Sequence, residues 1–201
     1  MERQDAIEEI ALIRRVIEES RRFTFDNGKH YLLWGVLVTI AIFLQYWAIL
    51  THADSLSPWI WLFSIGLGWV GSIVFGMREK SKPGAWPVGA KLVAAVWISA
   101  GVSMTILGFV GPASGALRYW AVCPTIATVM GGAYVVSSLI YKLKWVTMVG
   151  IAWWIGGLLM FMVRGVETLP IFGVMMILFQ IVPAVVFNRT WKRLSAPTSA
   201  V

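Results

Sequence analysis

Acidic side chains are missing from the long apolar stretches of this chain. The ten aspartate and glutamate residues lie within the first 26 positions or at the edges of apolar stretches, as Asp54, Glu79 and Glu167 do. Proton-driven pumps and many ion-coupled carriers place ionisable groups at mid-membrane, where such groups are costly and usually functional. The sequence therefore weighs against both classes, and it excludes intramembrane proteolysis by paired aspartates.

Histidine and cysteine are equally scarce, which limits metal and redox chemistry. The two histidines, His30 and His52, lie at opposite ends of the first apolar stretch, roughly a bilayer thickness apart at about 1.5 Å per helical residue. They are too distant to ligate one metal ion or haem within a subunit. Cys123 is the only cysteine, so no intrachain disulfide forms. With no H-E-x-x-H motif either, we predict no catalytic residues, no metal site, no cofactor and no enzymatic activity.

Long apolar runs, by contrast, dominate the chain. Apolar residues make up 58% of it, above the roughly 45–50% of soluble domains. Six stretches are long enough to cross a hydrocarbon core of roughly 30 Å as helices, which satisfy their own backbone polar groups. We place them at 31–50, 58–77, 88–110, 118–140, 145–163 and 169–187. The predicted fold class is therefore an all-α polytopic membrane protein with six transmembrane helices, the third of them ended by Gly111-Pro112.

The basic residues predict how these helices are oriented. Of the seventeen lysine and arginine residues, all except Arg118 and Arg164 lie before the first stretch, after the last, or in and beside the second and fourth connections. The positive-inside rule assigns that side to the cytoplasm. We therefore expect both termini in the cytoplasm and a location in a bacterial-type inner membrane. The net charge of +7 then reflects topology, and no nucleic-acid partner is expected, because the charges are spread over four segments.

An amphipathic segment precedes the first stretch. Positions 4–22 carry an apolar stripe at helical spacing, with acids early and arginines late, as the helix dipole favours. The stripe consists of Ala6, Ile7, Ile10, Ile13 and Ile17. Acids balance the arginines on the polar surface, so attraction to anionic lipid is weak and the stripe fits protein contact instead. Packing against the protein's own cytoplasmic loops, self-association and docking of a separate partner all remain open.

The chain thus divides into three predicted parts. The first is this cytoplasmic helix with its following turn, at 1–28, in which Gly28 or Asn27 is suited to a left-handed conformation. The second is the six-helix transmembrane domain at 29–188. The third is a short basic cytoplasmic tail at 189–201.

Tryptophan is abundant, with twelve residues, and four of them fall near mid-span. These are Trp69, Trp97, Trp153 and Trp154, and Pro124 should bend the fourth helix. Each indole N–H needs an acceptor, for which the nearby polar side chains are Gln45, Ser64, Ser72, Ser99, Ser103 and Gln180. One interpretation is an aromatic-lined pocket for a lipid, a quinone or a hydrophobic cation. The interpretation we favour is helix packing in which tryptophan fills space. Tyr31 and Tyr141, near span ends, are assigned to the aromatic belts.

The two arginines on the other side of the membrane form a small candidate site. Arg118 begins the fourth stretch and Arg164 follows the fifth, with Glu167 nearby. Two cations among few acids suit an anionic headgroup or a small anion. A solvated salt bridge, worth about 0–1 kcal/mol, is the more frequent role for such residues.

The layout resembles that of a group of six-span bacterial integral membrane proteins with an amphipathic cytoplasmic N-terminal helix. The resemblance rests on the helix at 7–22, the turn Phe25-Asp26-Asn27-Gly28, the step Trp34-Gly35, and Ile181-Val182-Pro183 ahead of the basic residues at 189–193. The glycine expected after that proline is replaced by Ala184. Because the group has no established activity, the resemblance implies an architecture and no chemistry.

Two functions remain from these observations. The first is a non-enzymatic membrane scaffold, accessory subunit or regulator that docks a cytoplasmic or membrane protein, or a second copy of itself, through the N-terminal stripe. The second is a passive carrier or channel for a small neutral or hydrophobic solute, which would use the bent fourth helix and the mid-span tryptophans. The lipid bilayer is the one partner common to both.

Overall fold

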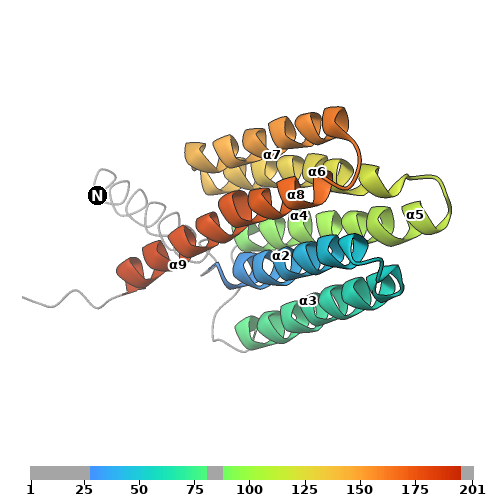
Figure 1. Cartoon of the computed structure of the whole chain (residues 1–201). Helices are drawn as coiled ribbons and strands as arrows, with labels where there is room; N and C mark the ends of the chain where they lie inside the picture. The colour runs from blue at the N-terminus through green and yellow to red at the C-terminus, as the bar shows by residue number, and fades with distance from the viewer. Residues whose placement is uncertain (1–27, 81–87, 196–201) are drawn as a thin grey trace, which may run out of the picture.

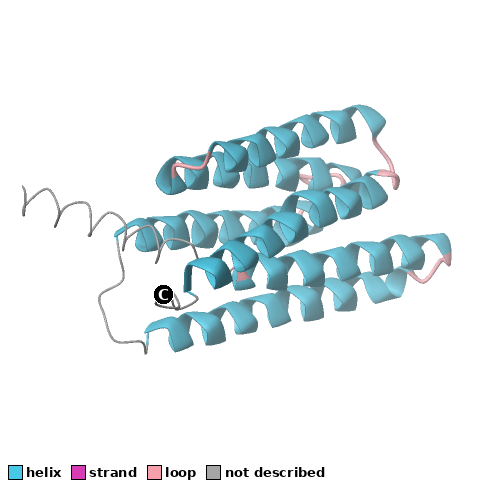
Figure 2. Ribbon diagram, turned by 90° about the vertical axis from the view of Figure 1, so that its left-hand side faces the viewer, coloured by secondary structure: helices cyan, strands magenta, loops and turns pink. Residues whose placement is uncertain are grey.

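The computed structural model describes residues 28–80 and 88–195, and within these ranges the chain is helical and has no strand. The long helices are α2 (Lys29–Leu50), α3 (Ser57–Lys80), α4 (Val88–Thr105), α6 (Tyr119–Tyr141), α7 (Lys144–Val163) and α9 (Val182–Ser195). Shorter ones are α5 (Gly111–Ala113) and α8 (Thr168–Met176), with a 3₁₀ turn η1 (Asp54–Leu56) and two π-helical segments, η2 (Ile106–Val110) and η3 (Ile177–Ile181). Together they form an elongated bundle whose loops gather at its two ends (Figures 1 and 2).

Six of these helical paths are long and apolar enough to cross a membrane. They run over Lys29–Leu50, Asp54–Arg78, Val88–Ala113, Tyr119–Tyr141, Lys144–Val163 and Thr168–Arg189. Each overlaps one predicted stretch and differs from it by only a few residues at either end. The predicted all-α polytopic fold is therefore confirmed, because apolarity over a bilayer's thickness is a strong signal in the sequence.

The prediction that Gly111-Pro112 ends the third helix is wrong, since the helical path continues through both residues to Ala113. A proline normally clashes with the carbonyl four residues earlier and leaves that carbonyl without a donor. For Pro112 that carbonyl belongs to Gly108. Gly108 lies in the π-helical segment η2, which comes directly before Gly111. A wider π turn changes this geometry, so Pro112 is accommodated and the turn falls at Ser114.

The central pair is α6 and α7, which run antiparallel and approach closely at glycines. A Cβ on Gly150 would lie 2.8 Å from the Gly131 carbonyl oxygen, and one on Gly131 would overlap the Trp154 ring. On the other side of the bundle, α2 packs against both α3 and the α8–α9 path (Figure 1). Small residues at helix contacts are the usual means of association in a membrane.

The helices α3 and α4 lie at the periphery. Only 6% of the second span and 11% of the third are buried within the bundle, against 33–50% of the other four. Two polar junctions hold α3 to α2: Trp34 Nε1 donates to Ser72 Oγ at 2.9 Å, and Gln45 bridges Ser57 and Trp61 at 2.7 and 3.1 Å. The outward face of α3 remains apolar, as expected for a surface that meets lipid.

Candidate functional site

A buried group of polar and aromatic side chains joins four of the helical paths. We call it the core cluster, and it consists of Tyr31 on α2, Trp97 on α4, Tyr134 and Ser137 on α6, and Gln180 on η3. Tyr134 and Ser137 have no exposed surface, and Gln180 has 2%. Three hydrogen bonds between helices that are distant in sequence run through this cluster.

Hydrogen bonds connect the members of the core cluster in pairs. The Tyr134 hydroxyl donates to Gln180 Oε1 at 2.5 Å, and Gln180 Nε2 donates to the Tyr31 carbonyl oxygen at 3.3 Å. Trp97 Nε1 donates to Ser137 Oγ at 3.1 Å. Within residues 28–80 and 88–195, every buried side-chain nitrogen or oxygen has a hydrogen-bond partner. The polar groups of the cluster thus satisfy one another and bind helices that are far apart in sequence.

Ring contacts reinforce these hydrogen bonds. The Tyr31 ring lies 4.9 Å from the Trp97 ring in an edge-to-face arrangement, and 5.9 Å from Tyr134. Trp97 and Tyr134 meet edge to face at 5.1 Å, and Phe187 on α9 packs against Tyr31 at 5.6 Å. Such pairs contribute about 0.5–1.5 kcal/mol each beyond the area they bury. The cluster is therefore a packed joint between the first, third, fourth and sixth spans.

Sequence reasoning missed most of this cluster. Tyr31 and Tyr141 were expected in the aromatic belts, but they are only 5% and 4% exposed. Their hydroxyl oxygens lie 3.5 Å apart. Tyr134 and Ser137 were not singled out at all. Their spacing of three residues is a signal that was available, because it places two polar groups on one face of a helix, and polar groups within a span turn towards the interior.

The first turn of α2 is fixed against the sixth span. Gly28 has a left-handed backbone, with φ of 67°, as the sequence predicted for this turn. A Cβ at Gly28 would overlap the carbonyl oxygen of Ala184, and one at Gly35 would lie 2.8 Å from the Ile181 side chain. Glycine is therefore required at position 28 for both its conformation and its contact. Together with Tyr31, these contacts anchor the start of the transmembrane domain in its core.

Trp153 contacts the sixth span close to its proline, Pro183. Its side chain is fully buried and its Nε1 donates to the Phe179 carbonyl oxygen at 3.4 Å. In a regular helix that carbonyl would accept from the residue at position 183, which is a proline and has no N–H. The π-helical segment η3 ends just before Pro183. The indole of Trp153 thus supplies a donor to a carbonyl whose usual α-helical partner is a proline.

The other mid-span tryptophans lie in different surroundings. Trp154 is 43% exposed and donates to the Thr128 carbonyl oxygen at 3.0 Å. Trp69 meets Trp34 edge to face at 6.0 Å and packs beside Gly101 on α4. Pro124 is buried inside α6, with its carbonyl oxygen next to Gly157.

The acceptors expected for these indoles therefore need correction. Trp97 uses Ser137, while Trp153 and Trp154 use backbone carbonyls, and none of the three uses a side chain named from the sequence. Backbone acceptors cannot be read from residue types, which explains the error. Trp69, Trp97, Trp153 and Trp154 contact separate neighbours rather than one another, so their contacts are those of packed helices. The aromatic-lined pocket stays a prediction.

At the opposite end of the bundle, the two isolated arginines lie on neighbouring helix ends. Arg118 caps the start of α6, and Arg164 follows α7 and places its guanidinium carbon 5.6 Å from the centre of the Trp120 ring. Arg164 Nε also donates to the Phe161 carbonyl oxygen at 3.4 Å. The Arg164 backbone has φ of 53° and ψ of 157°. Residues other than glycine rarely adopt this conformation, and where they do, the position is often functional.

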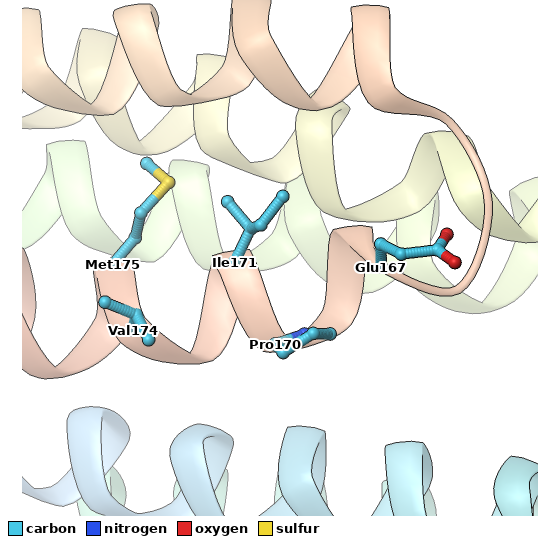
Figure 3. A pocket seen from close by; sticks show the side chains of 5 residues that line it. All are labelled: Glu167, Pro170, Ile171, Val174 and Met175. Atoms are coloured by element: carbon cyan, nitrogen blue, oxygen red, sulfur yellow. The ribbon is translucent and has the colours of Figure 1, made fainter.

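A shallow, open apolar groove lies along α8. It has a volume of about 440 Å³ and is lined by Glu167, Pro170, Ile171, Val174 and Met175, all on or next to α8. Figure 3 shows Met175 and Ile171 on one side of the helix and Val174 and Pro170 on the other, with the Glu167 carboxylate next to the α7–α8 turn. Glu167 stands out in the sequence as one of few acids on this side, whereas a surface groove leaves no mark on residue types.

The predicted partner-binding residues Ile7, Ile10, Ile13 and Ile17 lie outside the described residues. Comparison with known proteins gives no match: no family model, no curated protein and no solved structure is similar to this chain. Functional proposals therefore rest on the chain's own residues.

Proposed function

We propose that this chain is a non-enzymatic integral membrane protein that acts as a scaffold, accessory subunit or regulator. It docks a protein partner through the apolar stripe of its N-terminal segment, in which Ile10, Ile13 and Ile17 form the contact. Orientation follows the basic residues, which gather at the end of the bundle where α2 begins, so both termini and the docking segment face the cytoplasm of a bacterial-type inner membrane.

The observation that carries this proposal is the anchor at the start of α2. The docking segment joins the transmembrane domain at Gly28, which touches Ala184 on α9. Three residues later, Tyr31 packs in the core cluster against Trp97, Tyr134 and Phe187. The described chain therefore begins at the joint between four spans. This arrangement suits a regulator or scaffold, in which an event at the membrane surface is coupled to the bundle.

The interior supports the same proposal over a carrier. A carrier needs polar groups that face a solute path and exchange partners as the solute passes. The core cluster instead has its polar groups paired among themselves, with Tyr134 and Gln180 hydrogen-bonded at 2.5 Å. Aromatic rings fill the space between the spans. These contacts favour a rigid joint, and no observation favours the carrier specifically.

Site-specific photocrosslinking in intact cells tests the docking face. A photoreactive residue replaces Ile13 in one version of the full chain and Glu8 in another, because a helix over 4–22 places these two positions on opposite faces. We expect a discrete protein adduct from position 13 that is absent from position 8. An adduct with a second copy of the chain identifies self-association, and an adduct with another protein identifies an accessory role.

Two further variants test the stripe and provide a matched control. Ile17→Asp should abolish the position-13 adduct, because a carboxylate on the stripe is desolvated at a protein contact. Glu8→Asp introduces the same side chain on the polar face without changing the charge and should leave the adduct intact. The proposal is overturned when position 13 yields no discrete adduct, or when positions 8 and 13 yield the same one.

A further inference from the structure

The sixth span consists of two helices joined by an irregular segment. The helices α8 and α9 meet at the π-helical segment η3 (Ile177–Ile181), and Pro183 follows two residues later. A π-helical segment and a proline are both established causes of bending in a helix. Here the two occur within seven residues of each other, so the sixth span has a defined place at which it can bend.

The two halves of this span pack against different neighbours. On α8, a Cβ at Gly173 would lie 3.0 Å from the ring of Phe43, which is in the second half of α2. On α9, the Phe187 ring lies 5.0 Å from that of Trp145 in the first turn of α7, and the start of α2 meets the α9 backbone at Gly28. A motion of α9 about η3 therefore changes contacts at one end of the bundle and leaves those of α8 in place.

Beyond η3, α9 forms a long arm. It runs over Val182–Ser195 and projects past the ends of α2, α3 and α7 (Figure 1). From Ile181 to Arg189 the arm measures about 12 Å at roughly 1.5 Å per residue, so a change of about 20° in the kink angle moves Arg189 by about 4 Å. The third span has no comparable arm, because Pro112 lies one residue before that helix ends at Ala113.

The side chain of Gln180 holds the irregular segment in its observed position. Gln180 lies within η3 and is 2% exposed. Its Oε1 accepts from the Tyr134 hydroxyl on α6 at 2.5 Å, and its Nε2 donates to the Tyr31 carbonyl oxygen on α2 at 3.3 Å. One side chain thus ties the bending point to two other spans, and the loss of either bond leaves a buried polar atom of Gln180 without its partner.

We propose that the sixth span is a regulatory hinge. The segment η3 is the pivot, α9 is the moving arm, and the hydrogen bonds of Gln180 keep the hinge closed. In the closed position the joint between the spans is rigid. When Gln180 is released, α9 swings at the end of the bundle where α2 begins, while α8 keeps its place. The hinge does not depend on the N-terminal segment, so its test is separate from that of the proposed function.

Distances between pairs of spin labels, measured by electron paramagnetic resonance on the full chain in lipid nanodiscs, test this hinge. The first pair, Met77→Cys with Arg189→Cys, joins α3 to the arm. The second pair, Ser55→Cys with Glu167→Cys, joins the same two helical paths at the opposite end of the bundle. All four positions are exposed, and the natural Cys123 is buried.

We expect one narrow distance for each pair in the otherwise unmodified chain. Gln180→Leu removes both hydrogen bonds and should shift or broaden the 77–189 distance by about 4 Å, as calculated for a bend of about 20°. The 55–167 distance should not change. Tyr134→Phe removes only the hydroxyl group and keeps the ring, so it should produce the same type of change even where Gln180→Leu gives too little folded protein.

The matched control is Thr147→Val. It removes another hydroxyl that bonds two helices, since Thr147 Oγ1 on α7 donates to Ser138 Oγ on α6 at 2.8 Å, but it does not touch the sixth span. The 77–189 distance should stay as in the unmodified chain.

Three results would overturn the hinge. The first is a 77–189 distance that neither Gln180→Leu nor Tyr134→Phe alters. The second is an equal change in Thr147→Val. The third is an equal change in the 55–167 distance, which would mean that the whole bundle loosens and that α9 does not move separately from α8.

Discussion

Single hydrogen bonds determine how firmly the core cluster holds the spans together. The Tyr134 hydroxyl and Gln180 are both buried, and each is the other's partner at 2.5 Å. No water replaces a lost partner in such an interior, so removal of one group leaves the other unsatisfied. The effect is moderated in a membrane because the separated helices also find partners, and measured values average about 0.6 kcal/mol with a maximum near 1.7.

Tyr134→Phe should therefore destabilise the protein by about 1 kcal/mol, because Gln180 Oε1 loses its donor. Gln180→Leu in the same chain should add less than it costs alone, since both changes break one interaction. The free energy of unfolding, measured by titration with a denaturing detergent in mixed micelles, checks this. Tyr119→Phe, at 82% exposure, is the control. Fully additive effects of Tyr134→Phe and Gln180→Leu would contradict the hydrogen bond.

Gly28→Ala should destabilise the protein more than Gly115→Ala. Both glycines have positive φ, of 67° and 74°, so each substitution carries a backbone cost of about 1–2 kcal/mol. Gly115 faces open space, whereas a Cβ on Gly28 would overlap the backbone of Ala184, which adds about 1–3 kcal/mol of overpacking. The same unfolding titration measures the difference. Equal effects of the two substitutions would show that the start of α2 is not anchored there.

At the scale of elements, two prolines follow π-helical segments: Pro183 lies within a continuing helix, and Pro112 lies one residue before its helix ends at Ala113. Pro112 follows η2 and Pro183 follows η3. A wider turn changes the geometry around the carbonyl that proline would otherwise leave unpaired. In the sixth span the Phe179 carbonyl also receives the indole N–H of Trp153, a contact between the fifth and sixth spans.

Trp153→Phe should destabilise the protein by more in the natural chain than in a Pro183→Ala background. Alanine restores a backbone N–H at position 183, so the Phe179 carbonyl no longer depends on the indole. We expect a coupling of about 0.5–1 kcal/mol between the two positions in a double-mutant cycle. Independent effects would mean that the indole serves packing alone.

How much of these elements the sequence predicts depends on the physical signal involved. The six spans follow from apolarity alone, and the turn at Gly28 follows from Asp26-Asn27-Gly28. The π-helical segments and the backbone acceptors of Trp153 and Trp154 leave no mark on residue types. The core cluster and the groove on α8 were missed because they arise from helices that are distant in sequence, whose neighbours periodicity does not specify.

At the scale of the whole molecule, orientation is the prediction that the described contacts do not test. The single cysteine, Cys123, is buried, so an introduced cysteine can be labelled against a low background. Ser114→Cys, exposed in the turn after α5, should react with a membrane-impermeant maleimide in intact cells. Lys144→Cys, exposed at the start of α7, should react only after the membrane is opened. The reverse pattern would invert the topology.

The central claim is that the N-terminal segment docks a partner and is attached to an independently formed six-helix core. Native mass spectrometry after gentle detergent extraction tests it most directly, by comparing the full chain with one lacking residues 2–22. We predict that the truncated chain stays folded but loses a bound protein or an oligomer that the full chain retains. Identical protein stoichiometry in the two versions would contradict the claim and exclude the segment as the docking surface.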